Sequence, residues 1–417
     1  MNSYIYNCFN CNKEFSAELI EDNFHYLCHD CGKAEKNQPL KGVLTVEYDY
    51  NELKKKLNRE EFLRLPPGKF WLYPHLWPIN FTTFNETILN QLVLPEDQLL
   101  SFKYKGADIS LMDETRNPTL SYKDRASSLV ALKAKELGIK EISAASTGNA
   151  GSSLAGVCAR MGLTAHIFVP SSIPSAKRIQ IQSFGANIYL VDGSYDDAFD
   201  LCFEVSKEKK WYNRNTAYNP LTIEGKKSAA YDIFISSKGK LPDVIFIPVG
   251  DGVIISGIYK GFYDLKKLGW IEKLPKLIAV QAEGSNALVR YLEKGKFEFK
   301  PAETIADSIC AGAPRNLYMA ADAVKSTNGR AVSVSDDEIL SAQKLIANKF
   351  GILAEPSSSA SFAGYLKLCE ANEIASKEKV LLIITGNGLK NITVSEKWNK
   401  IPKSLSFSGW KEFFSIK

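Results

Sequence analysis

Lys123 stands in a setting that could make it chemically reactive. It lies in the segment NPTLSYKDRAS (residues 117–127), between Tyr122 and the pair Asp124–Arg125, where a polar loop turns into a helix. A lysine amine is a usable nucleophile only when it is neutral, and partial removal from water lowers its pKa enough to permit that. The segment therefore predicts a nucleophilic lysine that is shielded from solvent.

Four cysteines near the N-terminus form a second constellation. Cys8 and Cys11 make one CxxC pair and Cys28 and Cys31 another, with 16 residues between the pairs. This spacing fits a tetrahedral Zn²⁺ site, in which each tight turn supplies two thiolates. Two disulfides in a secreted protein are the alternative, but the N-terminus lacks the basic and apolar pattern of a signal peptide. The sequence therefore predicts a structural zinc ribbon over residues 1–38.

The glycine-rich turn in IFIPVGDGVIISG (residues 245–257) suits an anion. An apolar strand leads into a helix that begins near Val253, and the free N–H groups and the dipole of that helix favour a negative charge. Gly250 and Gly252 would let the backbone approach a phosphate, whereas Asp251 counts against one unless its side chain faces away. A tight turn without a ligand is the alternative interpretation.

Two further strand ends carry small polar residues. STGNAGSS (residues 146–153) opens a helix with neutral donors that suit a carboxylate or a phenolate oxygen, although Ser146 or Thr147 could simply cap that helix. ITGNGLK (residues 384–390) presents the hydroxyl of Thr385, or is a plain strand exit. Together, the four segments fit a flat aromatic aldehyde with a phosphate arm, held covalently by a lysine.

The elements that must position these segments follow from the hydrophobic pattern. From residue 125 onward, helices alternate with fully apolar strands, which is typical of parallel sheets covered on both faces. In such sheets, ligands lie beyond the carboxyl ends of the strands. Residues 49–65 have helical spacing, and the proline- and aromatic-rich residues 66–81 predict an extended, packed segment.

In this order, the four segments resemble those of the pyridoxal-phosphate enzymes of the tryptophan synthase β family (fold type II), and most closely those of threonine synthases. NPTLSYKDR resembles the lysine motif N-P-T-x-S-F-K-D-R, STGNAGSS the asparagine loop, PVGDGVIISG the phosphate loop and ITGNGLK the T-G-x-G-L-K segment. Residues 223–233 and 354–361 also correspond, so the likeness covers residues 105–395. Some threonine synthases also carry a ribbon with two CxxC pairs.

The resemblance implies an α/β fold of two doubly wound parallel-sheet domains behind the ribbon. Residues 39–126 and 223–417 would form the large domain, and residues 127–222 the small domain with the asparagine loop.

The resemblance also implies roles. Lys123 would form the Schiff base with pyridoxal 5'-phosphate and later move protons on the substrate, Asn149 would donate to the ring oxygen, and Thr385 would face the ring nitrogen. A neutral hydroxyl there leaves the ring a weaker electron sink, which favours elimination or replacement over amino transfer. The remaining implied contacts are Gly250, Asp251, Gly252, Val253 and Ile254 for the cofactor phosphate, and Ser146, Thr147 and Ala150 for the substrate carboxylate.

The chain departs from the family at positions that would recognise the substrate. Threonine synthases read N-P-x-R-x-x-G where this chain reads NPLTIEG, so Thr222 stands where an arginine that binds the substrate's phosphate is expected. Val253 and Ile254 replace amide side chains, and no G-E-G-x-T-P-L segment precedes the lysine motif. Arg125 is the favoured replacement for the missing charge, and we expect solvated surface charges at Arg116, Lys226, Lys227 and Arg315.

The implied activity is elimination or replacement on a small amino acid, most specifically O-phosphohomoserine plus water giving threonine and phosphate. The alternative is an amino-acid dehydratase or a β-replacement enzyme, cysteate-synthase-like, that needs no substrate phosphate. A different class is a binding protein whose ribbon contacts nucleic acid. Residues 1–38 hold three lysines and no arginine, which is too few for a surface that follows phosphates.

Composition sets the remaining expectations. A chain of 417 residues with 45% hydrophobic residues and a net charge of +5 supports two or three domains and disfavours a dedicated nucleic-acid or membrane-surface protein. Its apolar runs stay well short of the roughly 20 residues that span a bilayer. We therefore expect a cytoplasmic enzyme, monomeric or homodimeric, with a small amino-acid substrate, pyridoxal phosphate and a structural Zn²⁺, and without nucleic-acid or membrane partners.

Overall fold

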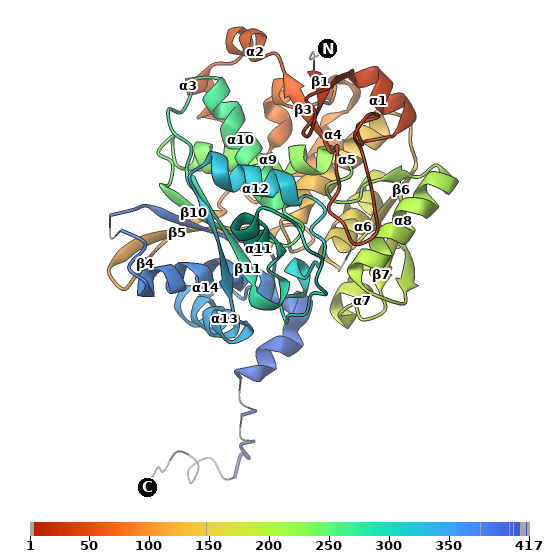
Figure 1. The fold of residues 1–417 in the computed structure, drawn as a ribbon. Helices are drawn as coiled ribbons and strands as arrows, with labels where there is room; N and C mark the ends of the chain where they lie inside the picture. Colours follow the sequence, from red (N-terminus) through yellow and green to blue (C-terminus); the bar gives the residue numbers. More distant parts are fainter. Residues whose placement is uncertain are drawn as a thin grey trace.

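The computed structural model of the chain describes residues 4–146, 148–375, 377–399, 401–402, 404–408 and 414. Within these residues the chain forms three sheets. Figure 1 shows the N-terminal ribbon at the top, the small parallel sheet with its helices on the right, and the large sheet on the left. No helix of the described ranges is long and apolar enough to cross a membrane.

The ribbon is an antiparallel sheet with the strand order β2-β1-β3. Its elements are β1 (Tyr4–Cys8), β2 (Glu14–Ser16), α1 (Ala17–Asn23) and β3 (Leu44–Tyr48). The strand β3 lies past residue 38, so this sheet includes a strand from the stretch that follows the two CxxC pairs.

Short helices rich in buried aromatic residues connect the ribbon to the large sheet. Residues 49–65 form two helices rather than one, because Asn58 leaves the helical conformation and caps the second helix with its side chain. The prediction of an extended segment at residues 66–81 was wrong, since 3-10 turns there bury Phe70 and Trp77. The elements are α2 (Tyr50–Lys56), α3 (Arg59–Phe62), η1 (Phe70–Leu72), η2 (Pro74–Leu76), η3 (Phe81–Thr83) and α4 (Glu86–Asn90).

The large sheet has the strand order β12-β11-β10-β13-β5-β4 and is parallel except for β4, which pairs antiparallel with β5. Its strands are β4 (Leu99–Tyr104), β5 (Ala107–Asp113), β10 (Val244–Pro248), β11 (Lys276–Ala282), β12 (Arg330–Val334) and β13 (Val380–Ile384). The helices outside the small sheet are η4 (Glu114–Arg116), α5 (Lys123–Glu136), α9 (Leu221–Ser236), α10 (Val253–Lys267), η5 (Glu283–Ser285), α11 (Ala287–Lys294), η6 (Asp307–Ile309), α12 (Leu317–Ser326), α13 (Asp336–Phe350), α14 (Pro356–Glu370) and η7 (Gly388–Lys397).

The small sheet has the strand order β8-β7-β6-β9 and is parallel throughout. Its strands are β6 (Glu141–Ala145), β7 (Thr164–Pro170), β8 (Asn187–Val191) and β9 (Tyr212–Asn213). The helices between them are α6 (Asn149–Met161), α7 (Ser175–Ser183) and α8 (Tyr195–Lys209). Two parallel α/β sheets behind a small ribbon confirm the predicted fold class.

The helix α9 lies between α5 and α10, and glycines permit the close approach. A Cβ atom at Gly225 of α9 would lie 2.5 Å from the carbonyl oxygen of Arg125 on α5. One at Gly257 of α10 would lie 2.6 Å from Cβ of Lys226. Any larger side chain at Gly225 or Gly257 would push the helices apart.

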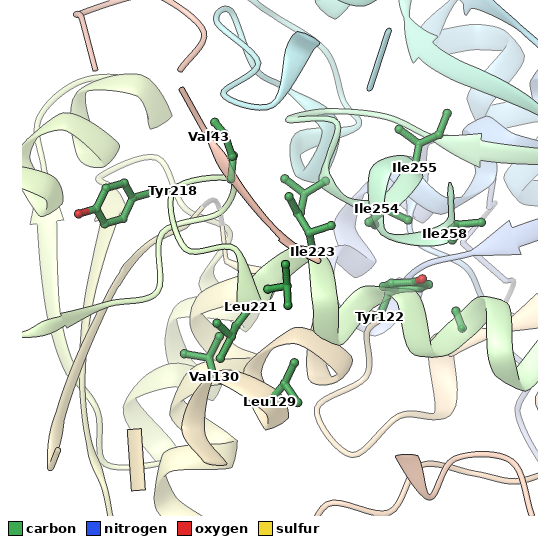
Figure 2. Packing of buried hydrophobic residues seen from close by; sticks show 14 of the residues in the cluster. Val43, Tyr122, Leu129, Val130, Tyr218, Leu221, Ile223, Ile254, Ile255 and Ile258 are labelled. Atoms are coloured by element: carbon green, nitrogen blue, oxygen red, sulfur yellow. The ribbon is translucent and has the colours of Figure 1, made fainter. Parts of the chain in front are cut away.

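Aliphatic side chains fill the space around these glycine contacts. Leu221 and Ile223 of α9 share one buried cluster with Leu129 and Val130 of α5 and with Ile254 of α10 (Figure 2). This packing fixes the start of α5, the first turns of α9 and the start of α10 relative to one another, and Lys123 and the predicted phosphate turn lie at two of these places.

Candidate active site

One cavity opens at the carboxyl ends of β6, β10 and β13, and all four predicted segments meet there. Thr147 lies outside the described residues. The other predicted residues of the cofactor and substrate sites all line the cavity: Lys123, Ser146, Asn149, Ala150, Gly250, Asp251, Gly252, Val253, Ile254 and Thr385.

Lys123 is the first residue of α5, and the loop before it is held against the end of β13. The amide of Tyr122 donates to the carbonyl of Thr385 at 2.8 Å. The Tyr122 hydroxyl donates to the carbonyl of Lys226 on α9, also at 2.8 Å. Leu120 adopts a φ of +66°, which turns the chain sharply into the helix. These contacts set the direction in which the Lys123 side chain leaves the backbone.

The surroundings of Lys123 make its amine less basic. Burial lowers its pKa to about 8, while the Glu355 carboxylate opposes this shift and the Arg214 guanidinium adds to it. A group with a pKa this close to neutrality can both accept and release a proton under ordinary conditions.

Asp124 and Arg125 hold the turn and the helix rather than a ligand. The Asp124 carboxylate accepts from the amide of Thr119 at 2.7 Å. The Arg125 guanidinium pairs with Glu114 at 2.7 Å and with Asp232 at 2.6 Å, and all three side chains are buried. The expectation that Arg125 replaces the missing phosphate-binding charge was therefore wrong, because two carboxylates already engage it.

The turn before α10 packs closely on its neighbours and leaves the amides of the helix start free. Gly252 has a φ of +88°, and a Cβ atom there would lie 2.7 Å from Cβ of Ala320. A Cβ atom at Gly250 would lie 2.8 Å from Cα of Ile309. No side chain of the described residues caps α10, so the amides of its first turn, from Val253 onward, face the cavity mouth as free donors.

Asp251 does not place its charge among these donors. Its carboxylate accepts from the hydroxyl of Tyr195 at 2.6 Å and from the amide of Arg315 at 3.1 Å. Its carbonyl accepts from the amide of Asn316 at 3.0 Å. The side chain is therefore turned toward its neighbours, which removes the objection to a phosphate at this turn.

The asparagine loop begins α6 with Gly148, not with Ser146 or Thr147, as the N-cap. Gly148 has a φ of +131°, and a Cβ atom there would lie 2.3 Å from Cδ of Lys177. Ser146 still supports the helix start, because its hydroxyl oxygen accepts from the amides of Gly148 and Gly151, both at 2.8 Å. Its hydroxyl hydrogen remains available to a ligand.

Asn149 is held by residues that the sequence did not single out. Its amide nitrogen donates to Glu355 at 2.7 Å and to the Ser308 hydroxyl at 2.9 Å. Its buried amide oxygen has no partner in the part of the chain that the structure describes. Buried Lys177 in turn pairs with Asp307 at 2.5 Å and with Glu355 at 3.6 Å. An unsatisfied buried amide atom at a cavity wall is typical of a position that a ligand completes.

Thr385 ends β13 with its hydroxyl in the cavity wall. The hydroxyl oxygen lies 3.1 Å from that of Ser358, which also accepts from the amide of Gly386 at 2.7 Å. A neutral hydroxyl network therefore stands at the end of this strand.

Three basic residues that we expected on the surface are buried instead: Lys226, Lys227 and Arg315. Arg116 is exposed, as expected. Lys227 pairs with Glu224 at 2.6 Å and with Asp264 at 2.9 Å, whereas Lys226 lines the cavity. The only sequence signal for this burial is that both lysines interrupt an otherwise apolar helix.

Arg315 connects the ribbon to the turn before α10. Its guanidinium donates to the carbonyl oxygens of Gln38 at 3.0 Å and Glu35 at 3.4 Å, where the chain leaves the ribbon. Its backbone amide holds Asp251, and its own carbonyl accepts from the amide of Leu40 at 3.1 Å.

The four ribbon cysteines gather as a zinc site requires. Their sulfur atoms all lie within 4.8 Å of one another, with Cys8 and Cys31 at 3.4 Å and Cys11 and Cys28 at 3.6 Å. Four thiolates bound to one tetrahedral Zn²⁺ would lie roughly 3.8 Å apart. The cluster therefore fits this metal in size, ligand type and ligand number.

Comparison with known proteins identifies the family. The family model described as pyridoxal-phosphate dependent enzyme matches residues 96–386. The chain belongs to this family. The threonine synthase of Methanocaldococcus jannaschii is 35% identical over 393 residues, which is 92% of each chain. That of Methanosarcina acetivorans is 34% identical over 385 residues, which is 91% of each chain. The chain is thus a pyridoxal-phosphate-dependent, threonine synthase-like lyase.

Solved structures share the fold at lower identity. A fungal L-serine ammonia-lyase from Rhizomucor miehei superimposes with a TM-score of 0.62 at 20% identity and covers 73% of this chain and 96% of its own. A threonine deaminase from Solanum lycopersicum superimposes with a TM-score of 0.59 at 21% identity and covers 92% of both chains.

The cavity fits the cofactor of this family. The free amides at the start of α10 suit a phosphate, and Lys123 offers an amine of lowered pKa. The NH2 group of Asn149 donates to Glu355 and Ser308, so it would have to turn from them toward the cavity to donate to a ring oxygen. These groups line a single cavity, so one pyridoxal phosphate could contact all of them.

Proposed function

We propose that this enzyme makes threonine and phosphate from O-phosphohomoserine and water. The observation that carries the proposal is the single cavity in which the Lys123 amine, the Asn149 amide and the free amides of α10 lie together. The similarity to two threonine synthases over nine-tenths of the chain supports the choice among family reactions.

We assign the cofactor contacts as follows. The amides from Gly250 to Ile254 hold the phosphate, Asn149 binds the ring oxygen, and the Thr385 hydroxyl faces the ring nitrogen. Pyridoxal phosphate, when bound, acidifies the C–H bonds near the amino group of an amino acid. A neutral hydroxyl at the ring nitrogen favours loss or replacement of a group over amino transfer.

Lys123 is the group that moves protons on the substrate carbons. Its pKa of about 8 suits both the removal and the return of a proton near neutral pH. The backbone of the preceding residue, Tyr122, is held by Thr385, and Lys123 lines the same cavity as the phosphate turn and the asparagine loop, so it can act on a substrate bound there.

The start of α6 binds the substrate carboxylate. The hydroxyl hydrogen of Ser146 and the amide of Ala150 lie in the cavity wall at a helix N-terminus, where the dipole favours an anion. Thr147 belongs to this group by its place in the sequence. The assignment orients the amino acid with its side chain away from α6.

The ribbon zinc, in this proposal, is structural. Four thiolates complete its coordination and leave no position for a substrate. The cytoplasmic location, the monomeric or homodimeric state and the domain boundaries at residues 38, 126 and 222 stay predictions.

A dehydratase or a β-replacement enzyme is the second candidate, favoured by Thr222. The Thr222 side chain is neutral, and its hydroxyl hydrogen is already donated to the carbonyl of Asn219 at 2.7 Å. Thr222 therefore offers neither a charge nor a free donor to a substrate phosphate. Purified enzyme should release threonine and phosphate from O-phosphohomoserine. If it releases neither, and instead deaminates serine or threonine, the second candidate is correct.

A further inference from the structure

Two buried cations beside the cavity have no acidic partner among the residues described. Lys226 and Arg214 are 1% and 0% exposed. Among the described residues, the Lys226 amine makes a single long contact, with the carbonyl oxygen of Thr222 at 3.3 Å. The Arg214 guanidinium contacts the Thr216 hydroxyl at 3.4 Å, and its Nε and Nη2 atoms have no partner in the described part of the chain.

Lys226 lines the cavity itself, and Arg214 supports the wall behind it through Thr216, which also lines the cavity. Burial and repulsion by Arg214 and Lys123 lower the pKa of Lys226, and the Asp251 carboxylate opposes that shift. A buried amine without a carboxylate partner tends to give up its proton, and an anion beside it would favour the charged form. The unpaired amine in the cavity wall is therefore suited to an anionic ligand.

The position of Lys226 explains the missing arginine at position 222. Residues four apart on a helix share one face, so Lys226 lies one turn along α9 from Thr222 on the same side. A basic side chain is thus present one helical turn from position 222, and it lines the cavity.

We propose that Lys226, supported by Arg214, binds the anionic side-chain group of the substrate, a phosphate ester in the reaction proposed above. This inference rests on the proposed function for the identity of the ester, whereas the cation pair itself does not. The cofactor phosphate has its own donors in the amides of α10, so the proposal assigns the Lys226 amine to a second anion in the same cavity.

The test compares Lys226→Gln and Lys226→Arg with the wild-type holoenzyme. Calorimetric titration with inorganic phosphate should give about 10- to 100-fold weaker binding for Lys226→Gln, because a charged hydrogen bond is lost, and near-wild-type binding for Lys226→Arg. Lys133→Gln is the matched control, since Lys133 is equally buried but pairs with Glu21 and Glu136. It should leave phosphate binding unchanged. Wild-type phosphate affinity in Lys226→Gln overturns the proposal.

A second measurement separates the substrate phosphate from the cofactor phosphate. Absorbance titration of apoprotein with pyridoxal phosphate should give an affinity for Lys226→Gln within about 3-fold of wild type. A loss of about 10-fold or more would assign Lys226 to the cofactor and overturn the proposal. The KM for O-phosphohomoserine should rise in Lys226→Gln by the same factor as the phosphate affinity falls.

The two proposals fail in different ways. A wild-type enzyme that binds phosphate through Lys226 but does not convert O-phosphohomoserine refutes the proposed function and supports the anion site. An enzyme that makes threonine equally well with Lys226→Gln refutes the anion site alone.

Discussion

The buried lysines on the two sides of α9 differ in whether a carboxylate pairs with them. On one side, Lys227 and Lys260 are neutralised by Glu224 and Asp264 in a fully paired cluster. On the other side, Lys226 lies one residue earlier and lines the cavity, and no carboxylate of the described residues pairs with it. A paired buried charge stabilises the fold at most modestly, whereas an unpaired one weakens it until a ligand arrives. The contrast separates residues that hold the structure from residues kept for function.

The largest expected effect is on the cavity side, at Lys123. Lys123→Ala should lower kcat by at least about 10³-fold, because the group that moves protons is removed. The free energy of unfolding of the apoprotein should stay within about 1 kcal/mol of wild type, since no ion pair is lost. Steady-state assays and urea unfolding check both parts. A variant that keeps a tenth of the activity would contradict the assignment.

The next effect lies on the paired side. Lys227→Gln should lower the free energy of unfolding by about 3 to 5 kcal/mol, because it leaves Glu224 and Asp264 buried without their cation. Lys226→Gln, the adjacent and equally buried substitution, should cause no loss of stability in the apoprotein. Equal destabilisation by the two variants in urea unfolding would contradict the distinction between a paired Lys227 and an unpaired Lys226.

A smaller effect is the pH dependence of the Lys123 amine. Its pKa is about 8 in the folded chain against 10.5 for an ordinary lysine, so its labelling by an amine-directed reagent should level off above about pH 8. Between pH 8 and 10.5 the unfolded apoprotein binds the additional proton, so its free energy of unfolding should rise with pH across this window.

Peptide mapping of the labelled apoprotein measures this titration. Arg214→Gln removes a charge that lowers the pKa of Lys123, so the plateau should move to higher pH. A wild-type plateau near the ordinary lysine value would show that burial does not act on this amine.

The smallest expected effect is that of zinc removal on the catalytic body. Chelation under reducing conditions should unfold the ribbon, because a four-thiolate site supplies much of the folding energy of so small a module. The affinity for pyridoxal phosphate should fall several-fold, by about 1 kcal/mol, through Arg315 and Asp251. Metal analysis, circular dichroism and cofactor titration check the two parts; cofactor affinity unchanged by complete zinc loss would show that the two modules are uncoupled.

The segments that line the cavity could be singled out from the sequence because each is local. A glycine turn between a strand and a helix, or a lysine at a helix start, can be recognised from a few consecutive residues. The carboxyl ends of parallel strands meet at one edge of a sheet, so such segments are expected to lie close together. The same reasoning could not find Glu355 or Lys177, which reach Asn149 from distant elements.

The burial and pairing of charged residues were harder to predict from the sequence. Arg125 was expected at a ligand, yet its partner Asp232 lies 107 residues away and only the packing of α5 on α9 brings them together. Lys226 and Lys227 look alike in the sequence, and the helical rotation between them decides which one meets Asp264 and which one meets the cavity. Whether a buried charge is neutralised depends on tertiary contacts, so no local pattern encodes it.

Arg315 connects the ribbon to a turn of the catalytic body that lies outside the ribbon itself. Through the Gln38 carbonyl at one end and the Asp251 carboxylate at the other, a single residue links the chain that leaves the ribbon to the turn before α10, so a change in the ribbon could reach that turn. Under zinc limitation, such an enzyme would slow before its body unfolds, and amino-acid output would then follow the metal supply of the cell.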